Sequence, residues 1–107
     1  MASSREYLEY VMEQLSGVEG VSSRAMMGEY VLYLGGKVVG GVYDDRLLLK
    51  PTKTAVRLME AAFGSAQTDV PYPGAKPHLV ADVDDRELTA RVLRAIAQEL
   101  PPPKRRK

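Results

Sequence analysis

Residues 24–50 read RAMMGEYVLYLGGKVVGGVYDDRLLLK, and this stretch decides the fold. It is rich in Val, Leu and Tyr, and it is interrupted by Gly35-Gly36 and by Asp44-Asp45. Both pairs can form tight turns, the second with or without Arg46, so the apolar runs between them are typical of strands folded back on one another. The pattern predicts strands at about 22–27, 29–34, 37–43 and 46–50, joined as an antiparallel meander.

Both faces of this predicted sheet are apolar. Tyr30, Leu32 and Leu34 point to one face, whereas Val31 and Tyr33 point to the other. A sheet with one face in water should carry polar residues at every second position, and this one does not. We therefore expect helices on one face and a second copy of the chain, or another partner, over part of the other. The alternative is that the tyrosines rim the sheet with their hydroxyls in water.

Gly40-Gly41 falls inside the third predicted strand. Glycine in a strand costs stability, and it usually marks a bulge or the close approach of another backbone. The pair predicts a place where a helix or a partner lies close to the sheet.

The segments directly before and after the meander each predict a helix. Ser3 and Glu6 have the spacing of a capping box, followed by a helix over about 4–16 that Gly17 can end in a left-handed conformation. Thr52 can cap a helix over about 53–63 that ends at Gly64.

The last part of the chain predicts a loop, a strand and a helix. Residues 69–77 contain three of the seven prolines and predict a rigid, irregular loop with room for one short edge strand. A strand over about 77–82 follows, and then Asp84 with Glu87 can cap a helix that runs to the prolines at 101–103.

The predicted order is α-β-β-β-β-α-β-α, an α+β two-layer domain over residues 1–100. Its antiparallel sheet comprises the four-strand meander plus one or two later strands, with the helices packed mainly on one face. Residues 101–107 form a flexible, proline-rich, basic tail in this prediction.

Composition indicates a soluble, cytoplasmic, single-domain protein. The 107 residues include 45% hydrophobic and 27% charged residues, and there is no cysteine, so disulfides and thiolate metal sites are excluded. The N-terminus carries Glu6 and Glu9 and lacks the apolar core of a signal peptide, and no apolar run approaches the roughly 20 residues of a membrane span.

The positive charge is concentrated at the C-terminus. The net charge is +1, but four of the 15 basic residues are Lys104, Arg105, Arg106 and Lys107. The remaining 11 face 14 acidic residues, so the body carries about −3. Nucleic acid binding is therefore expected only through the tail, where it would be weak and sensitive to salt.

The sequence predicts no catalytic site, no metal and no cofactor. His78 is the only histidine, and no nucleophile motif accompanies it. Asp82, Asp84 and Asp85 form an acidic cluster, but an EF-hand loop begun at Asp82 would have Glu87 where glycine is required. Carboxylates at a helix N-terminus explain the cluster without an ion.

Most of residues 5–100 resemble the N-terminal domain of the TfoX/Sxy family. That family follows a pattern close to R-x-M-F-G-G-Y-G-x-Y, then D-G-K, then D-D and L-Y-L-K. The matching residues here are Met26-Met27-Gly28, Tyr30, Leu32-Tyr33, Gly36-Lys37-Val38, Asp44-Asp45 and Leu47-Leu48-Leu49-Lys50. Phe63-Gly64 and the loop from Tyr72 to Pro77 also lie where the family has a Phe-Gly pair and an aromatic-rich loop.

There are departures from the family pattern. Met27 stands where the family usually has phenylalanine, and Glu29 and Val31 replace glycines. Longer members carry a second, C-terminal helical domain, and we expect a single-domain member here. Those full-length members regulate natural competence together with a transcription activator.

The resemblance implies a non-catalytic bacterial module for regulation or protein interaction, acting as a homodimer or with another protein. Two alternatives are a nucleic-acid-associated transcriptional regulator that uses the basic tail and a domain that binds a small anionic ligand. Arg24 either pairs with Glu29 or Asp45, or anchors a partner's carboxylate or phosphate. The candidate contact residues are Arg24, Tyr30, Tyr33, Lys50 and His78.

Overall fold

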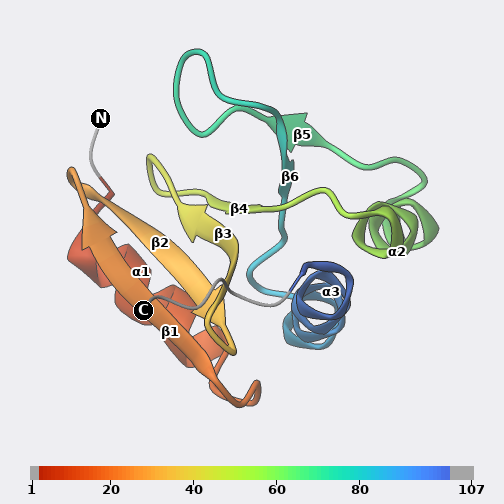
Figure 1. The fold of residues 1–107 in the computed structure, drawn as a ribbon, viewed down its shortest axis with the longest axis horizontal. Coiled ribbons are helices and arrows are strands. Elements are labelled where there is room, and N and C mark those ends of the chain that lie inside the picture. Colours follow the sequence, from red (N-terminus) through yellow and green to blue (C-terminus); the bar gives the residue numbers. More distant parts are fainter. Residues whose placement is uncertain (1–2, 102–107) are drawn as a thin grey trace.

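The computed structural model describes residues 3–101, and they form the predicted α+β domain. The predicted tail residues Pro102, Pro103 and Lys104–Lys107 lie outside this range. Nine elements follow one another in the order α-β-β-β-β-α-β-β-α, so both of the later strands are present (Figure 1). They are α1 (Arg5–Gln14), β1 (Val21–Met26), β2 (Glu29–Leu34), β3 (Lys37–Val42), β4 (Leu47–Leu49), α2 (Lys53–Phe63), β5 (Thr68–Asp69), β6 (His78–Val80) and α3 (Arg86–Glu99).

The six strands form one antiparallel sheet in the order β1-β2-β3-β4-β6-β5. The predicted meander is β1 to β4, and the later strands extend it beyond β4. Strands β1 and β5 are therefore the two edges. Helix α1 lies behind β1 and β2, and α2 and α3 lie beside each other near the other end of the sheet (Figure 1).

Three two-residue turns connect the strands of the meander. Their central residues are Met27–Gly28, Gly35–Gly36 and Asp44–Asp45, and all six have positive φ angles. Positive φ at both positions is the signature of a type I′ turn, whose twist matches that of the strands it joins. The two predicted turns are confirmed. The first predicted strand is shifted by one residue, because Met27 lies in a turn.

The core lies between the sheet and the three helices. The predicted alternation is confirmed on this face, because Leu32 and Leu34 are buried in the core and Tyr30 packs against it. Leu47, Leu49 and Leu79 from the neighbouring strands join them, together with Val11 from α1, Met59 from α2 and Val92, Leu93 and Ile96 from α3. Among residues 3–101, no helix combines the length and the apolar character that crossing a bilayer requires.

Within the described residues, the two strand glycines lie against neighbouring strands and a tyrosine, and not against a helix. Strand β3 has a bulge at this point, since Leu32 pairs with Gly40 but Tyr33 pairs with Val38. A Cβ on Gly40 would lie 2.9 Å from the Cα of Leu49, and one on Gly41 would lie 2.5 Å from the ring of Tyr43. The predicted bulge is confirmed, but the close neighbours are β4 and a tyrosine of the same chain.

Two predicted helix boundaries are wrong by a residue or more. Ser4, and not Ser3, caps α1, because its hydroxyl accepts from the backbone N–H of Tyr7 at 3.1 Å. The helix ends at Leu15 without a left-handed residue, so Gly17 does not end it.

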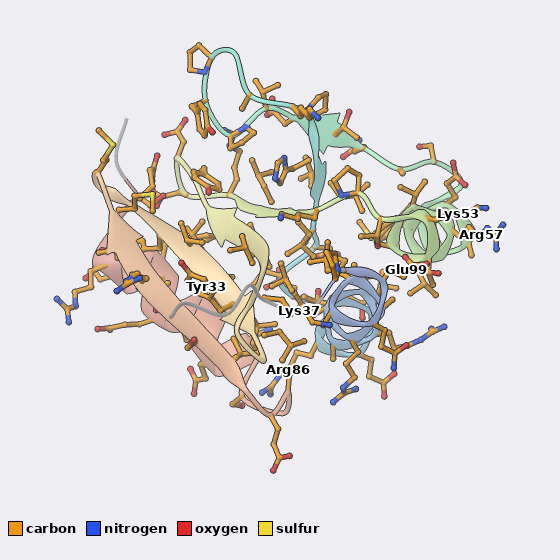
Figure 2. The ribbon with its side chains drawn as sticks, in the orientation of Figure 1. Tyr33, Lys37, Lys53, Arg57, Arg86 and Glu99 are labelled. Carbon is orange, nitrogen blue, oxygen red and sulfur yellow. The ribbon has the colours of Figure 1, made fainter. Side chains whose placement is uncertain are left out.

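The other helices are held at their ends by long-range contacts. Thr52 occupies the cap position of α2 without a side-chain hydrogen bond, while Gly64 ends that helix in the predicted left-handed conformation. The N-terminus of α2 is instead capped from α3, where Glu99 accepts from the N–H and the hydroxyl of Thr54 at 2.9 and 2.7 Å. Figure 2 shows Glu99 beside α2.

Asp85 is the N-cap of α3, and its carboxylate accepts from the N–H of Leu88. The predicted cap, Asp84, accepts instead from the hydroxyl of Tyr10. At the other end, Lys37 donates to the carbonyl oxygens of Ala97 and Leu100, at 2.6 and 3.2 Å (Figure 2). The last turn of α3 is thereby fixed to the hairpin between β2 and β3.

Candidate functional site

The sheet face opposite the helices, here called the outer face, is apolar as predicted. Val31, Gly41 and Leu48 lie in one row across β2, β3 and β4, and Val31 and Leu48 are buried. The chain provides part of their cover, because the ring of Tyr43 lies over Gly41 and Pro71, in the segment between β5 and β6, is also buried. The remaining part of the outer face is open.

An open groove of about 800 Å³, here called the outer groove, lies on this face. Three segments that are distant in sequence form it: the β1–β2 turn, the β3–β4 turn and residues 70–73. Eight lining residues are apolar or aromatic and three are charged. They are Met26, Met27, Val31, Tyr43, Val70, Pro71, Tyr72 and Pro73, with Glu29, Asp44 and Arg46.

Exposed apolar side chains are concentrated at this groove. Among residues 3–101, six large hydrophobic side chains are exposed, and four of them line it. Met27 is 98% exposed, Tyr72 59%, Met26 50% and Val70 39%. Contiguous exposed apolar surface of this kind marks binding sites, whereas single exposed hydrophobic residues need no explanation.

Glu29 holds the first two segments of the groove in place. One carboxylate oxygen accepts from the N–H and the hydroxyl of Ser3, at 2.8 and 2.5 Å, and the other accepts from the N–H of Asp44 at 3.1 Å. Asp45 completes the connection, since it accepts from the N–H of Ser4 and donates its own N–H to the hydroxyl of Ser3. The β3–β4 turn is thus bound to the start of the chain and to β2.

Arg46 holds the third segment. Its guanidinium donates to the carbonyl oxygen of Tyr43 and forms an ion pair with Asp69, and it lies 3.5 Å from the carbonyl oxygen of Val70. The single cation among the lining residues is therefore already engaged within the chain, and it fixes the start of the 70–73 segment beside the β3–β4 turn.

Two tyrosines face each other across the groove. The rings of Tyr43 and Tyr72 meet edge to face with centroids 6.4 Å apart. Burial raises the pKa of Tyr43 above its ordinary value, and nearby Tyr72 and Glu29 raise it further. The phenol therefore stays neutral at physiological pH, and it offers a partner an apolar ring with a hydrogen-bonding tip.

Met27 occupies a conformation that methionine rarely adopts. Its φ is 52° at the first central position of the β1–β2 turn, where asparagine, aspartate or glycine is usual. The side chain projects into solvent beside the groove and does not fill it. A strained backbone that presents a fully exposed apolar side chain is an outlier of the kind that collects at binding sites.

The structure places Arg24 near the groove but outside its lining. It lies on the edge strand β1 opposite Val31, and it is exposed. Within residues 3–101 it has no ion pair, so the first of its two alternatives, a pairing with Glu29 or Asp45, is not seen. Those carboxylates are occupied by backbone and serine donors.

The other candidate contact residues are spread over the sheet. Tyr30 lies on the helix-covered face, whereas Tyr33 lies on the outer face opposite Ser22 and Val38, half-buried (Figure 2). Lys50 follows β4 and His78 begins β6, where a ring nitrogen of His78 lies 3.0 Å from the carbonyl oxygen of Lys76. These residues do not form one cluster with Arg24, and Lys104–Lys107 lie outside the described residues.

The residues that form the groove were not singled out by the sequence pattern. The turn at Met27 could have been predicted, because Gly28 follows it between two apolar runs, and glycine favours the positive φ of a hairpin turn. Tyr43 follows the glycine pair that makes room for its ring. The place of Tyr72 in the groove could not be predicted from nearby residues, since only the tertiary fold brings the 70–73 segment beside β3.

Two comparisons relate the chain to known proteins. The sequence model of the TfoX N-terminal domain matches residues 13–98, which is most of the chain. The chain is also 39% identical over 109 aligned positions to an uncharacterized 12.7 kDa protein in the trpE 5′ region of Spirochaeta aurantia. That alignment covers all of this chain and 91% of the relative.

Proposed function

The chain belongs to the TfoX N-terminal domain family, and from this premise we propose that it is a non-catalytic, cytoplasmic regulatory module that docks a protein through the outer groove. The observation that carries the proposal is the gathering of Met27, Tyr72, Met26 and Val70 around one open groove. Burying one such side chain is worth roughly 1.5–3 kcal/mol, so together they can supply most of the energy of a specific contact.

The groove is already shaped for a partner. Its walls are tied by Glu29 and Arg46, and its aromatic pair is in contact before anything binds. A preorganised surface loses less conformational entropy on binding, which raises affinity without adding contacts.

The charges of the groove favour an apolar protein segment over a small anion. Glu29 and Arg46 are both engaged in hydrogen bonds within the chain, so the lining offers an anion no uncommitted guanidinium. The same engagement leaves these two groups poorly placed for proton transfer, and this supports a non-catalytic role. A partner is expected to contribute aliphatic or aromatic side chains, with polar contacts at the rim.

Site-specific photocrosslinking in the native host tests this proposal. A photoreactive amino acid at Met27 should give discrete adducts with protein, identified by mass spectrometry, and the adducts should weaken when Tyr72→Ser removes part of the groove. The matched control places the same amino acid at Phe63, which is 51% exposed on α2 and outside the groove. Equal adducts from both positions, or none from Met27, would contradict docking at the groove.

A further inference from the structure

We propose that the occupant of the outer groove is a second copy of this chain, with Met27 of each copy inserted into the groove of the other. The inference rests on the proposed function and names its partner. It follows from the presence, side by side on one surface, of a projecting apolar side chain and an apolar hollow.

Met27 has the properties of an inserting side chain. It is 98% exposed, and the two-residue turn fixes the direction in which it leaves the sheet. Met26, half exposed on the preceding residue, widens the apolar tip. Buried anchors of this kind dominate the energetics of interfaces, particularly where the surrounding surface excludes water.

The hollow is suited to receive that tip. The rings of Tyr43 and Tyr72, which contact each other, both line it, and Val31 and Pro71 are buried lining residues. Methionine is flexible and polarisable and packs favourably against aromatic rings. The volume of about 800 Å³ leaves room for Met27 together with part of Met26 from another copy.

A two-fold axis makes the two features reciprocal. In such an interface residue i contacts residue j of the other copy, and j contacts i, so one surface must carry both complementary parts. The same surface also carries one basic and one acidic side chain that a two-fold axis can bring together. Arg24 is exposed on the β1 side of the groove and Asp44 is exposed on the β3–β4 side, so an axis between them brings Arg24 to the partner's Asp44.

The size of the surface sets the expected strength. The groove and its rim occupy part of one face of a molecule with extents of 37 × 34 × 31 Å. We expect a contact confined to this part of one face to be small, in the class of interfaces that bury less than roughly 1,200 Å² in total, and the dimer to be reversible.

Sedimentation over a range of protein concentrations tests the proposal. The wild-type chain should pass from monomer to dimer, and Met27→Asp should weaken dimerisation by roughly thirtyfold or more. Aspartate tolerates the left-handed conformation of this turn, so the variant should fold. Phe63→Asp, with the same change at a half-exposed site outside the groove, should dimerise like the wild type.

Disulfide formation between two differently tagged copies locates the contact. Because the chain has no cysteine, each introduced thiol is the only one in its copy. Copies with Met27→Cys and Tyr72→Cys should form the mixed disulfide rapidly, and Phe63→Cys should not pair with either.

Several results would overturn the inference. A wild-type chain that stays monomeric at about 1 mM would do so, because an association weaker than this would not be a specific dimer. Disulfides between two Ser23→Cys copies, formed faster than the mixed pair, would assign the dimer to the β1 edge instead. If Met27 crosslinks to a different host protein and the purified chain is monomeric, the second copy is rejected as the occupant. The proposal that the groove docks a protein would then still hold.

Discussion

Met27 contributes little to the stability of the isolated chain. Its backbone is held at φ 52°, and its side chain is almost wholly in water, so the folded state gains little from it. This conformation costs most L-residues about 1–2 kcal/mol. The cost is lower for asparagine, because its side chain can form a hydrogen bond with the nearby backbone. The proposed docking gives this residue a role that the stability of the isolated chain does not.

Met27→Asn should consequently stabilise the isolated chain by about 0.5–1 kcal/mol while removing its docking. Urea denaturation at a protein concentration that keeps the chain monomeric measures the effect. The control is Met26→Asn, the same chemical change one residue earlier in β1, where extended backbone gives asparagine no advantage. Equal effects of the two substitutions would show that the turn conformation is not the cause.

Position 41 has room only for glycine, because the ring of Tyr43 occupies the space that a side chain would need. The ring of Tyr43 and the carbonyl oxygen of Tyr30 lie 2.5 and 2.6 Å from where a Cβ would be. A side chain here would push the ring away from the sheet, and that ring is one wall of the outer groove.

Gly41→Ala should destabilise the fold by about 1–3 kcal/mol, the usual cost of forcing a methyl group into a filled site. It should also weaken whatever the groove binds. Gly17→Ala is the matched control, since its added Cβ would meet nothing within 4 Å and its φ is not positive. Thermal unfolding of both variants is the measurement, and a loss of similar size at Gly17 would contradict the steric account.

At the scale of elements, the sequence predicts the helix ends and turns that depend on capping and turn residues close by in the chain. The bounds of α2 match the prediction because Thr52 and Gly64 mark its ends, and Asp44–Asp45 turns as expected. The caps at Ser4 and Asp85 were missed by one residue each, because an equivalent neighbour stands beside each of them. Which neighbour caps depends on distant contacts, namely Glu29 with Ser3 and Tyr10 with Asp84.

Glu29 joins elements that no local pattern connects. Its carboxylate accepts three hydrogen bonds from Ser3 and Asp44. Glu29→Gln replaces an acceptor by an amide donor that faces other donors, so it should cost about 1–2 kcal/mol in urea denaturation.

The control is Glu9→Gln. Glu9 pairs with Arg5 at 3.7 Å on an exposed helix surface, so its replacement should change stability by less than about 0.5 kcal/mol. Equal losses at the two positions would show that the network around Glu29 contributes nothing specific.

Glu99 gives the fold a dependence on acidic pH. The hydroxyl and the N–H of Thr54 donate to its carboxylate and lower its pKa below the ordinary value of 4.5. A lowered pKa in the folded state means that the ionised form stabilises the fold above the unfolded-state pKa. That contribution is lost as the pH falls through the folded-state pKa.

Glu99→Gln should therefore lower the urea midpoint at about pH 7, and this difference from the wild type should shrink as the pH falls through the folded-state pKa of Glu99. Glu60→Gln, the same change on the exposed surface of α2, serves as the control and should change the urea midpoint little at about pH 7. A difference between wild type and Glu99→Gln that persists undiminished at low pH would rule out the carboxylate as its source.

At the scale of the whole molecule, the apolar outer face was predictable and the groove was not. The alternation of Tyr30, Leu32 and Leu34 with Val31 and Tyr33 already showed that both faces of the sheet avoid water. The groove, however, needs Tyr72 placed beside Tyr43, and the ion pair between Arg46 and Asp69 that helps to place it spans 23 residues. Such placement depends on the complete packing of the chain.

The central claim is that a surface open in the isolated molecule is covered in the cell. Hydroxyl-radical footprinting tests it most directly, by comparing the oxidation of Met27 in cells of the native host with that in the dilute purified protein, with the half-exposed Phe63 as internal reference. We predict that Met27 is strongly protected in cells while Phe63 reacts equally in both. Oxidation of Met27 in cells at the rate of the dilute protein would contradict the account.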